Sequence, residues 1–270
     1  MNRRYQDFRS IDSRRRPAFT LVELLVVMGI IALIMGIALP VSFTVRRNAQ
    51  KAKFKRDIEA IQMGLSEYKN QFGEYPQTIG NYFPSPPAVA GTQKDGATVL
   101  CEALTGMYYD RKTSSLKPLT DPKSGRPRSA MINVEQFNIR TNIGSPPLVC
   151  IRDSSDLPIL YFPARVPAPD ITKPNLFVAA NSADALYSFK DCPSFLGKPS
   201  MADLQYLLGD GSKATPVVAP NGKIDGNENP SSTGPYILWE AGTDARFGFD
   251  PITGKTDDVT NFPIPVQYVR

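Results

Sequence analysis

One long uncharged run near the N-terminus constrains this chain more than any other part of its sequence. The run covers twenty-two residues, from 24 to 45, and follows directly after the acidic residue Glu23. As an α-helix it would span about 33 Å, close to the roughly 30 Å hydrocarbon core of a bilayer. A secretory signal peptide would have a shorter apolar region followed by a small-residue cleavage site, and this run has neither feature. The run therefore predicts a single membrane-spanning helix.

Apolar residues continue beyond this run at helical spacings. They predict an amphipathic helix that ends before Gly73 and Pro76. We therefore expect one helix over residues 19–72, with a transmembrane half at 19–45 and an exported amphipathic half at 46–76. The apolar stripe consists of Val45, Ala49, Ala52, Ile58, Ile61, Leu65, Tyr68 and Phe72, with Phe54 beside it.

Charge and composition narrow the functional classes. The chain carries a net charge of +5, of which residues 1–18 account for +4, so the remainder is nearly neutral. A nucleic-acid-binding domain would present clustered basic residues, and we expect no such partner here. Histidine is absent, which excludes Ser-His-Asp and Cys-His catalytic pairs and zinc sites with imidazole ligands. We therefore expect a protein that is not an enzyme.

Residues 14–40 combine a basic leader, a Phe-Thr-Leu-x-Glu sequence and the apolar run: RRRPAFTLVELLVVMGIIALIMGIALP. This segment resembles the N-terminus of type IV prepilins and of the pseudopilins of type II secretion. The resemblance implies that a prepilin peptidase removes the basic leader, residues 1–18, by cutting between Ala18 and Phe19. It also implies that the new amine of Phe19 is methylated. The family usually has glycine before the cut, where this chain has Ala18.

The same resemblance implies a single-pass protein of the bacterial inner membrane. The leader would lie in the cytoplasm and the C-terminal domain in the periplasm. An ionisable side chain inside an apolar span costs a few kcal/mol, so it is normally retained where a partner or a function requires it. The amine of Phe19 in a neighbouring subunit supplies such a partner for Glu23 at one axial offset. We therefore expect Glu23 to set the register of filament assembly; the alternative is an uncleaved signal anchor with Glu23 at the headgroup level.

The composition changes after Pro76. Nineteen prolines fall in residues 77–235, which favours short strands and loops over long helices. We expect an α+β fold in which the long N-terminal helix packs against an antiparallel β-sheet domain. A proline-rich α+β region with a large loop-rich insert would occupy residues 77–234, and a terminal strand and acidic loop residues 235–270. Helices are expected at 95–109, capped by Asp95, and at 200–209; strands are expected at 147–153, 158–166, 175–181, 185–191, 235–242 and 264–270.

Two passages resemble the globular part of major, G-type pseudopilins. They are YKNQFGEYPQT at residues 68–78 and the acidic segment at residues 235–262. Members of the family bind calcium with the second passage, where this chain has Ala245 in place of the usual glycine. Calcium takes about six to eight oxygen ligands, which carboxylates, hydroxyls and carbonyls of this loop could supply. The alternative is a solvated acidic loop without an ion. The candidate ligands are Asp244, Asp250, Asp257 and Asp258.

The chain has three cysteines, Cys101, Cys150 and Cys192. If the domain is exported to an oxidising compartment, at most one disulfide can form, and three pairings are possible. We favour Cys150–Cys192, because Cys101 lies on the apolar side of a predicted helix, where a buried thiol is usual. The alternative is that all three thiols are buried and reduced.

These features together indicate a pilin-like structural subunit that acts by assembly. The resemblance favours a type II secretion pseudopilus, whose partners would be other copies, other pseudopilins, the prepilin peptidase and the inner-membrane secretion platform. Two alternatives remain open. The first is a type IV pilus subunit for adhesion, motility or DNA uptake. The second is a membrane-anchored binding protein that uses the large insert for a ligand.

Overall fold

The structure is a computed structural model in which the chain forms two compact units, Met1–Arg46 and Arg47–Arg270. The α+β class expected from the sequence is confirmed. The residues that the structure describes are 20–78, 94–110, 112–121, 124–143, 148–153, 155–164, 187, 191–192, 208–209, 232, 234–248 and 256–264.

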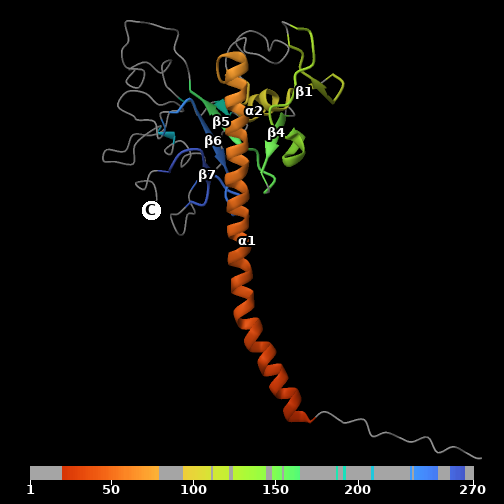
Figure 1. Cartoon of the computed structure of the whole chain (residues 1–270), viewed down its shortest axis with the longest axis vertical. Helices are drawn as coiled ribbons and strands as arrows, with labels where there is room; N and C mark the ends of the chain where they lie inside the picture. The colour runs from red at the N-terminus through yellow and green to blue at the C-terminus, as the bar shows by residue number, and fades with distance from the viewer. Residues whose placement is uncertain are drawn as a thin grey trace, which may run out of the picture. The chain divides into compact units, whose positions relative to one another are not determined.

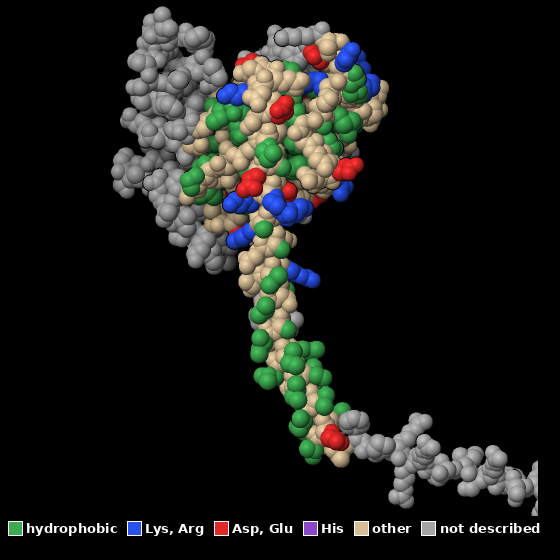
Figure 2. Space-filling model, in the orientation of Figure 1, with side chains coloured by type: hydrophobic (Ala, Val, Ile, Leu, Met, Phe, Trp, Pro, Cys, Tyr) green, Lys and Arg blue, Asp and Glu red, His purple; other side chains and the backbone are tan. Residues whose placement is uncertain are grey.

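Helix α1, Leu21–Phe72, is continuous, as the apolar pattern predicts. In the first unit its large apolar side chains are exposed, with Leu21 at 78% and Leu33 at 67% of their maximal accessible area. Figure 2 shows these apolar side chains along the helix. By length and composition, α1 qualifies as a membrane-spanning helix near the N-terminus. This is consistent with a membrane-anchored protein.

In the second unit, one face of α1 is buried. The buried face consists of residues spaced four and three apart, which is the period of a helix packed on one side. Its first member is Phe54, which is fully buried, whereas Val45 is 60% exposed. The period predicted from the sequence is therefore correct, but the predicted stripe starts too early in the chain. Its first three members, Val45, Ala49 and Ala52, are all exposed. The buried residues are Phe54, Ile58, Ile61, Leu65 and Tyr68.

Helix α2, Gly96–Thr105, is buried along its whole length. The side chain of Asp95 accepts a hydrogen bond from the backbone N–H of Ala97 at 3.0 Å, which confirms the predicted cap. The helix ends earlier than expected because Gly106 adopts a left-handed conformation, with φ of 66°. The residues after Gly106 form strand β1, Met107–Asp110, which pairs antiparallel with β2, Ser115–Pro118.

The remaining strands form two antiparallel sheets. Strand β3, Asn138–Ile143, pairs with β4, Leu148–Arg152, after the short helix η1, Val134–Gln136. The second sheet has the order β5–β6–β7. Figure 1 shows this sheet, and α2 with β4, at the C-terminal half of α1. The strands of the second sheet are β5, Leu160–Pro163; β6, Tyr236–Glu240; and β7, Val259–Thr260.

Strands β4, β5 and β6 confirm three of the six strands expected from the sequence. Strands β1, β2, β3 and β7 were not predicted. Strand β5 belongs to the 77–234 region and β6 to the 235–270 region, so the two regions share one sheet. The expected strands at 175–181 and 264–270, most of the one at 185–191 and most of the helix at 200–209 lie outside the described residues.

Two hydrophobic clusters lie on the two faces of β6. Tyr236 and Leu238 belong to the first cluster, together with Ile58, Ile61 and Leu65 of α1 and most of the apolar residues of α2. Ile237 and Trp239, the alternating residues of β6, belong to the second cluster, with Leu160 and Phe162 of β5. Successive side chains of a strand point to opposite faces, so β6 is buried on both sides. The sheet thus packs on the outer half of α1, as expected.

Candidate functional site

The N-terminus of α1 is capped by reciprocal hydrogen bonds between Thr20 and Glu23. The Thr20 hydroxyl accepts a bond from the backbone N–H of Glu23 at 3.2 Å. In return, Oε2 of Glu23 accepts bonds from the backbone N–H of Thr20 at 2.9 Å and from its hydroxyl at 3.0 Å. This arrangement is a capping box, which satisfies donors that the first turn of a helix leaves free. It was not predicted, although the Thr-x-x-Glu spacing in the sequence is the signal that could have revealed it.

Glu23 therefore has a local role in addition to the expected role in assembly. The side-chain hydrogen bonds of Glu23 to described residues all use Oε2, and the side chain is exposed. Oε1 is left available to a group from another chain. Ala18 and Phe19, the expected cleavage site, lie outside the described residues.

Residues 13–39 match the prokaryotic N-terminal methylation motif. This match supports a type IV prepilin-like N-terminus, and it includes Ala18, Phe19, Glu23 and the first part of the apolar run. It does not extend beyond residue 39, and no comparison separates a pseudopilin from a pilin. No curated protein and no solved structure matches the chain significantly.

A second candidate site lies at the end of the β5–β6–β7 sheet. One carboxylate oxygen from each of Asp244, Asp257 and Asp258 lies within 4.8 Å of the others. Asp244 follows β6 and the other two precede β7, and the pairing of Trp239 with Thr260 brings the two segments together. The fourth predicted ligand, Asp250, lies outside the described residues.

Asp257 is held by the turn that follows β6. Its Oδ2 accepts hydrogen bonds from the backbone N–H of Thr243 at 2.6 Å and from the Thr243 hydroxyl. Gly242 lies so close that a Cβ atom there would come within 2.2 Å of Oδ1 of Asp257. The turn therefore requires glycine at position 242, because any side chain would displace this carboxylate.

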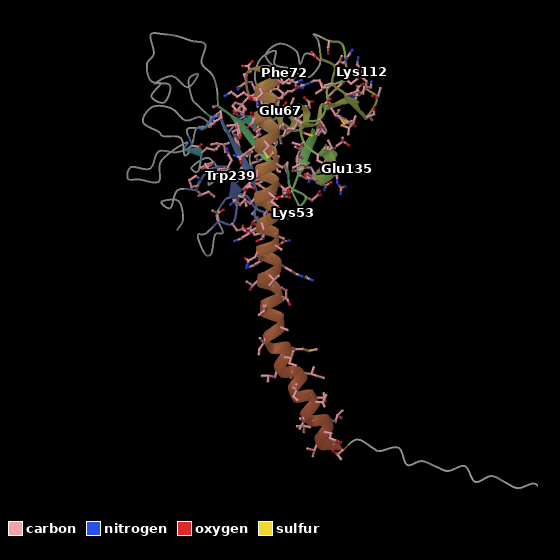
Figure 3. All side chains as sticks on the ribbon, in the orientation of Figure 1. Lys53, Glu67, Phe72, Lys112, Glu135 and Trp239 are labelled. Carbon is pink, nitrogen blue, oxygen red and sulfur yellow. The ribbon has the colours of Figure 1, made fainter. Side chains whose placement is uncertain are left out.

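Asp258 is tied to the core of the sheet. Its Oδ2 accepts hydrogen bonds from the indole Nε1 of Trp239 at 2.7 Å and from the backbone N–H of Gly248 at 2.8 Å. Burial raises the pKa of Asp258 to about 7, although these hydrogen bonds act in the opposite direction. A cation bound at the carboxylate would favour its charged form. Trp239 lies in β6, as Figure 3 shows.

Asp244 is the exposed member of the group. Its Oδ1 accepts a hydrogen bond from the backbone N–H of Arg246 at 2.9 Å. Its pKa is raised by desolvation and by the nearby Asp257. The next residue, Ala245, has φ of 57°, a left-handed conformation that favours glycine. The structure thus explains why the resembling family has glycine at this position.

Three carboxylates in this arrangement offer oxygen ligands to a hard cation such as calcium. Among the described residues, none of the three forms an ion pair with a lysine or arginine. Arg246 acts on the charge of Asp244 and opposes the rise of its pKa, but it forms no ion pair with any of the three. The residues fit a calcium ion in ligand chemistry.

Glu240 is a buried acidic residue that was not predicted from the sequence. It is 0% exposed, and neither of its carboxylate oxygens has a hydrogen-bond partner among the residues that the structure describes. Its pKa is raised to about 9, mainly by burial and also by the nearby Asp153 and Asp57, whereas Lys53 acts in the opposite direction. The alternation of β6 puts position 240 on the same face as Leu238. That pattern could have indicated the core-facing position, but not the neighbouring acids.

The three cysteines are free and buried in the structure. The disulfide Cys150–Cys192 expected from the sequence is not formed. Instead, Sγ of Cys192 donates a hydrogen bond to the carbonyl oxygen of Tyr161 at 3.5 Å. Burial raises the pKa of Cys101, and the neighbouring Cys150 raises it further. All three behave as buried, protonated thiols, which is the alternative that the sequence left open.

Proposed function

We propose that this chain is a pilin-like structural subunit of a type II secretion pseudopilus. In this proposal a prepilin peptidase cleaves it before Phe19, the new amine is methylated, and the subunit assembles through α1 without catalysing a reaction. The observation that carries the proposal is the methylation motif at residues 13–39, which lies on the start of a long apolar helix. The exposed Glu23 within that motif has one carboxylate oxygen available for a neighbouring subunit.

The cellular setting belongs to the same proposal. The subunit would be anchored in the bacterial inner membrane, with its C-terminal domain in the periplasm. Its partners would be further copies, other pseudopilins, the prepilin peptidase and the inner-membrane secretion platform. The G-type assignment has support in the acidic segment after β6, where Gly242 and the aspartates follow the pattern that the resembling pseudopilins have, while Ala245 departs from it.

We also propose that the acidic site binds one calcium ion. The proximity of Asp244, Asp257 and Asp258 supports this proposal, because calcium prefers carboxylate oxygens. Asp257 and Asp258 are held by backbone donors, so two ligands are positioned before the ion arrives. The ion would order the end of the exported domain and would play no part in catalysis.

The decisive experiment is mass spectrometry of the protein purified from membranes of cells with and without prepilin peptidase. With the peptidase, we expect a chain that begins at a methylated Phe19; without it, the leader should remain. An intact leader in both strains would overturn the proposal and favour the signal-anchor alternative. Copurification then separates the remaining alternatives. A secretion platform indicates a pseudopilin, pilus proteins indicate a pilin, and the absence of filament partners indicates an anchored binding protein.

A further inference from the structure

A cluster of basic side chains lies on α1 next to the apolar segment. Between residues 47 and 56 the helix carries five cations and no acidic residue. All five are exposed. Figure 2 shows blue side chains gathered on this part of the helix, and Figure 3 labels one of them, Lys53. We call this segment the basic collar; its members are Arg47, Lys51, Lys53, Lys55 and Arg56.

The positive charge of the basic collar is largely unneutralised within the described chain. Lys55 forms an ion pair with Glu59 at 4.0 Å, but both side chains are well exposed, and such pairs contribute little. Nε of Arg56 donates to the carbonyl oxygen of Ala52 at 3.4 Å, and its charge acts on the neighbouring Asp57 without an ion pair to any described residue. Even when Asp57 and Glu59 are included, residues 47–59 keep a net charge of +3.

The charge is local and does not reflect a generally basic protein. The whole chain has a net charge of +5, with +4 in residues 1–18 and +3 in residues 47–59, so the rest is slightly acidic. The described basic residues of the folded domain are partly used in contacts. Arg152, for example, pairs with Asp156 at 2.5 Å. The basic collar is therefore a distinct feature of α1.

Its place along the helix matches the headgroup layer of a bilayer. The basic collar begins two residues after the uncharged run ends at Val45. It extends about 14 Å along the helix axis at 1.5 Å per residue. The headgroup layer on each side of a bilayer is roughly 5–8 Å thick. If residues 24–45 fill the hydrocarbon core, the first cations lie among the headgroups and the others just beyond them.

The cations also point in more than one direction. Arg47, Lys51 and Lys55 follow one another at intervals of four, so they share one side of the helix. Lys53 and Arg56 lie on another side. Long basic side chains can extend along the helix toward phosphate groups while their apolar stems contact the lipid. The segment can therefore meet several lipids at once.

We propose that the basic collar binds the headgroups of anionic phospholipids in the bilayer that α1 crosses. The charge of the phosphate diester and of an anionic headgroup complements the unpaired cations, and a polybasic segment next to a membrane span is attracted to such lipids. The interaction holds the unassembled subunit in anionic regions of the membrane. It rests on the membrane anchoring of α1, and it is independent of which filament the subunit joins.

Native mass spectrometry of the full-length protein tests this inference. The protein is extracted into micelles that contain equal amounts of phosphatidylglycerol and phosphatidylcholine, and the lipids retained on each chain are counted. The triple variant Lys51→Gln, Lys53→Gln, Lys55→Gln removes three charges at exposed positions. We expect its preference for phosphatidylglycerol to fall roughly tenfold to a hundredfold relative to wild type. Raising the salt to about 0.5 M should reduce the wild-type preference.

The matched control removes three exposed cations from the folded domain, through Lys112→Gln, Arg126→Gln and Arg140→Gln. We expect this control to retain the wild-type preference. The wild type, the collar variant and the control variant have the same leader residues. The leader therefore does not contribute to the difference in lipid preference between them. Equal lipid preference in the two triple variants, or no preference in wild type, would overturn the inference. Membrane fractionation of the wild type checks the anchoring separately, and a chain recovered in the soluble fraction would contradict the membrane anchoring on which the inference rests.

Discussion

The indole Nε1 of Trp239 donates a hydrogen bond to Oδ2 of Asp258 at 2.7 Å. This contact joins a residue buried in β6 to a carboxylate of the candidate cation site. Trp239 is the only tryptophan of the chain, so its fluorescence reports on this site alone. This hydrogen bond also couples the acidic loop to the core of the sheet. A change in the charge of Asp258 should therefore change the stability of the folded domain.

The first prediction concerns calcium. Calcium should stabilise the folded protein, because a ligand that binds only the folded state adds about 2.7 kcal/mol at a hundredfold excess over Kd. Melting curves of the full chain with calcium or with a chelator, followed by Trp239 fluorescence, measure this effect. Asp257→Asn should abolish the shift, and Glu135→Gln, at an exposed position in η1, should preserve it. Identical melting with calcium and with chelator would show that the aspartates are solvated and bind no ion.

A second prediction follows from the left-handed backbone of Ala245. Such a conformation costs a non-glycine residue about 1–2 kcal/mol, whereas glycine adds a smaller entropy cost in the unfolded state. Ala245→Gly should therefore increase the free energy of unfolding by about 0.5–1 kcal/mol, measured by chemical denaturation without calcium. Ala130→Gly, at an exposed position without a left-handed backbone, should decrease it. A destabilising Ala245→Gly substitution would contradict the assigned conformation.

The third prediction is a pH dependence that arises from Glu240. Its pKa is raised from 4.5 to about 9, so the folded state holds a proton that the unfolded state releases. The contribution of Glu240 to the free energy of unfolding is fully present below pH 4.5 and is lost as the pH rises toward 9. Asp153 and Asp258 act in the same direction, but their pKa values of about 6 and about 7 end their contributions earlier.

Between pH 7 and 8 Glu240 is therefore the main source of this dependence, because the buried thiols of Cys101, Cys150 and Cys192 add a loss of their own only as the pH approaches 9, where the unfolded chain ionises its cysteines. Here the free energy of unfolding of the wild type should fall by up to about 1.4 kcal/mol per pH unit. Glu240→Gln removes the titrating group, so its curve should be nearly flat in this window and should lie above that of the wild type. Asp156→Asn, at an exposed position, serves as the control and should retain the wild-type slope. A wild-type curve that is flat between pH 7 and 8 would contradict the buried state of Glu240.

The fourth prediction separates the two roles of Glu23. Thr20→Ala removes the hydroxyl of the capping box but keeps the Glu23 charge, whereas Glu23→Gln removes the charge and keeps a side chain that can cap. If the carboxylate pairs with the amine of a neighbouring subunit, Glu23→Gln should weaken filament assembly strongly. Thr20→Ala should cost only about 1 kcal/mol at the helix start and leave assembly largely intact.

Filament imaging alongside membrane fractionation measures both effects. Both variants should still insert into the membrane, because the apolar run is unchanged. A Thr20→Ala variant that assembles as poorly as Glu23→Gln would mean that Glu23 acts through the helix start and not through its charge. Normal filaments from Glu23→Gln would remove Glu23 from the assembly contact altogether.

Features that depend on neighbouring residues were predictable from the sequence. The apolar run and the three-and-four spacing predicted α1, since a helix follows from the order of consecutive side chains. Asp95 and Gly106 marked the two ends of α2, although the predicted helix continued past Gly106. The methylation motif is likewise one continuous segment. In each of these cases, the residues that act together lie within a few turns of the same helix or within one short peptide.

Features that depend on pairing between distant residues were decided by the tertiary structure. Val45 was expected in the apolar stripe and Phe54 beside it, yet of these two only Phe54 is buried, because burial depends on what lies opposite each residue. Asp244 meets Asp257 and Asp258 because β6 and β7 pair in one register, and a two-residue strand such as β7 has no sequence pattern of its own. The same pairing puts Glu240 in the core. The sequence alone determined the helix and its motif, whereas strand register determined the acidic site, since register is a relation between segments and not a property of either one.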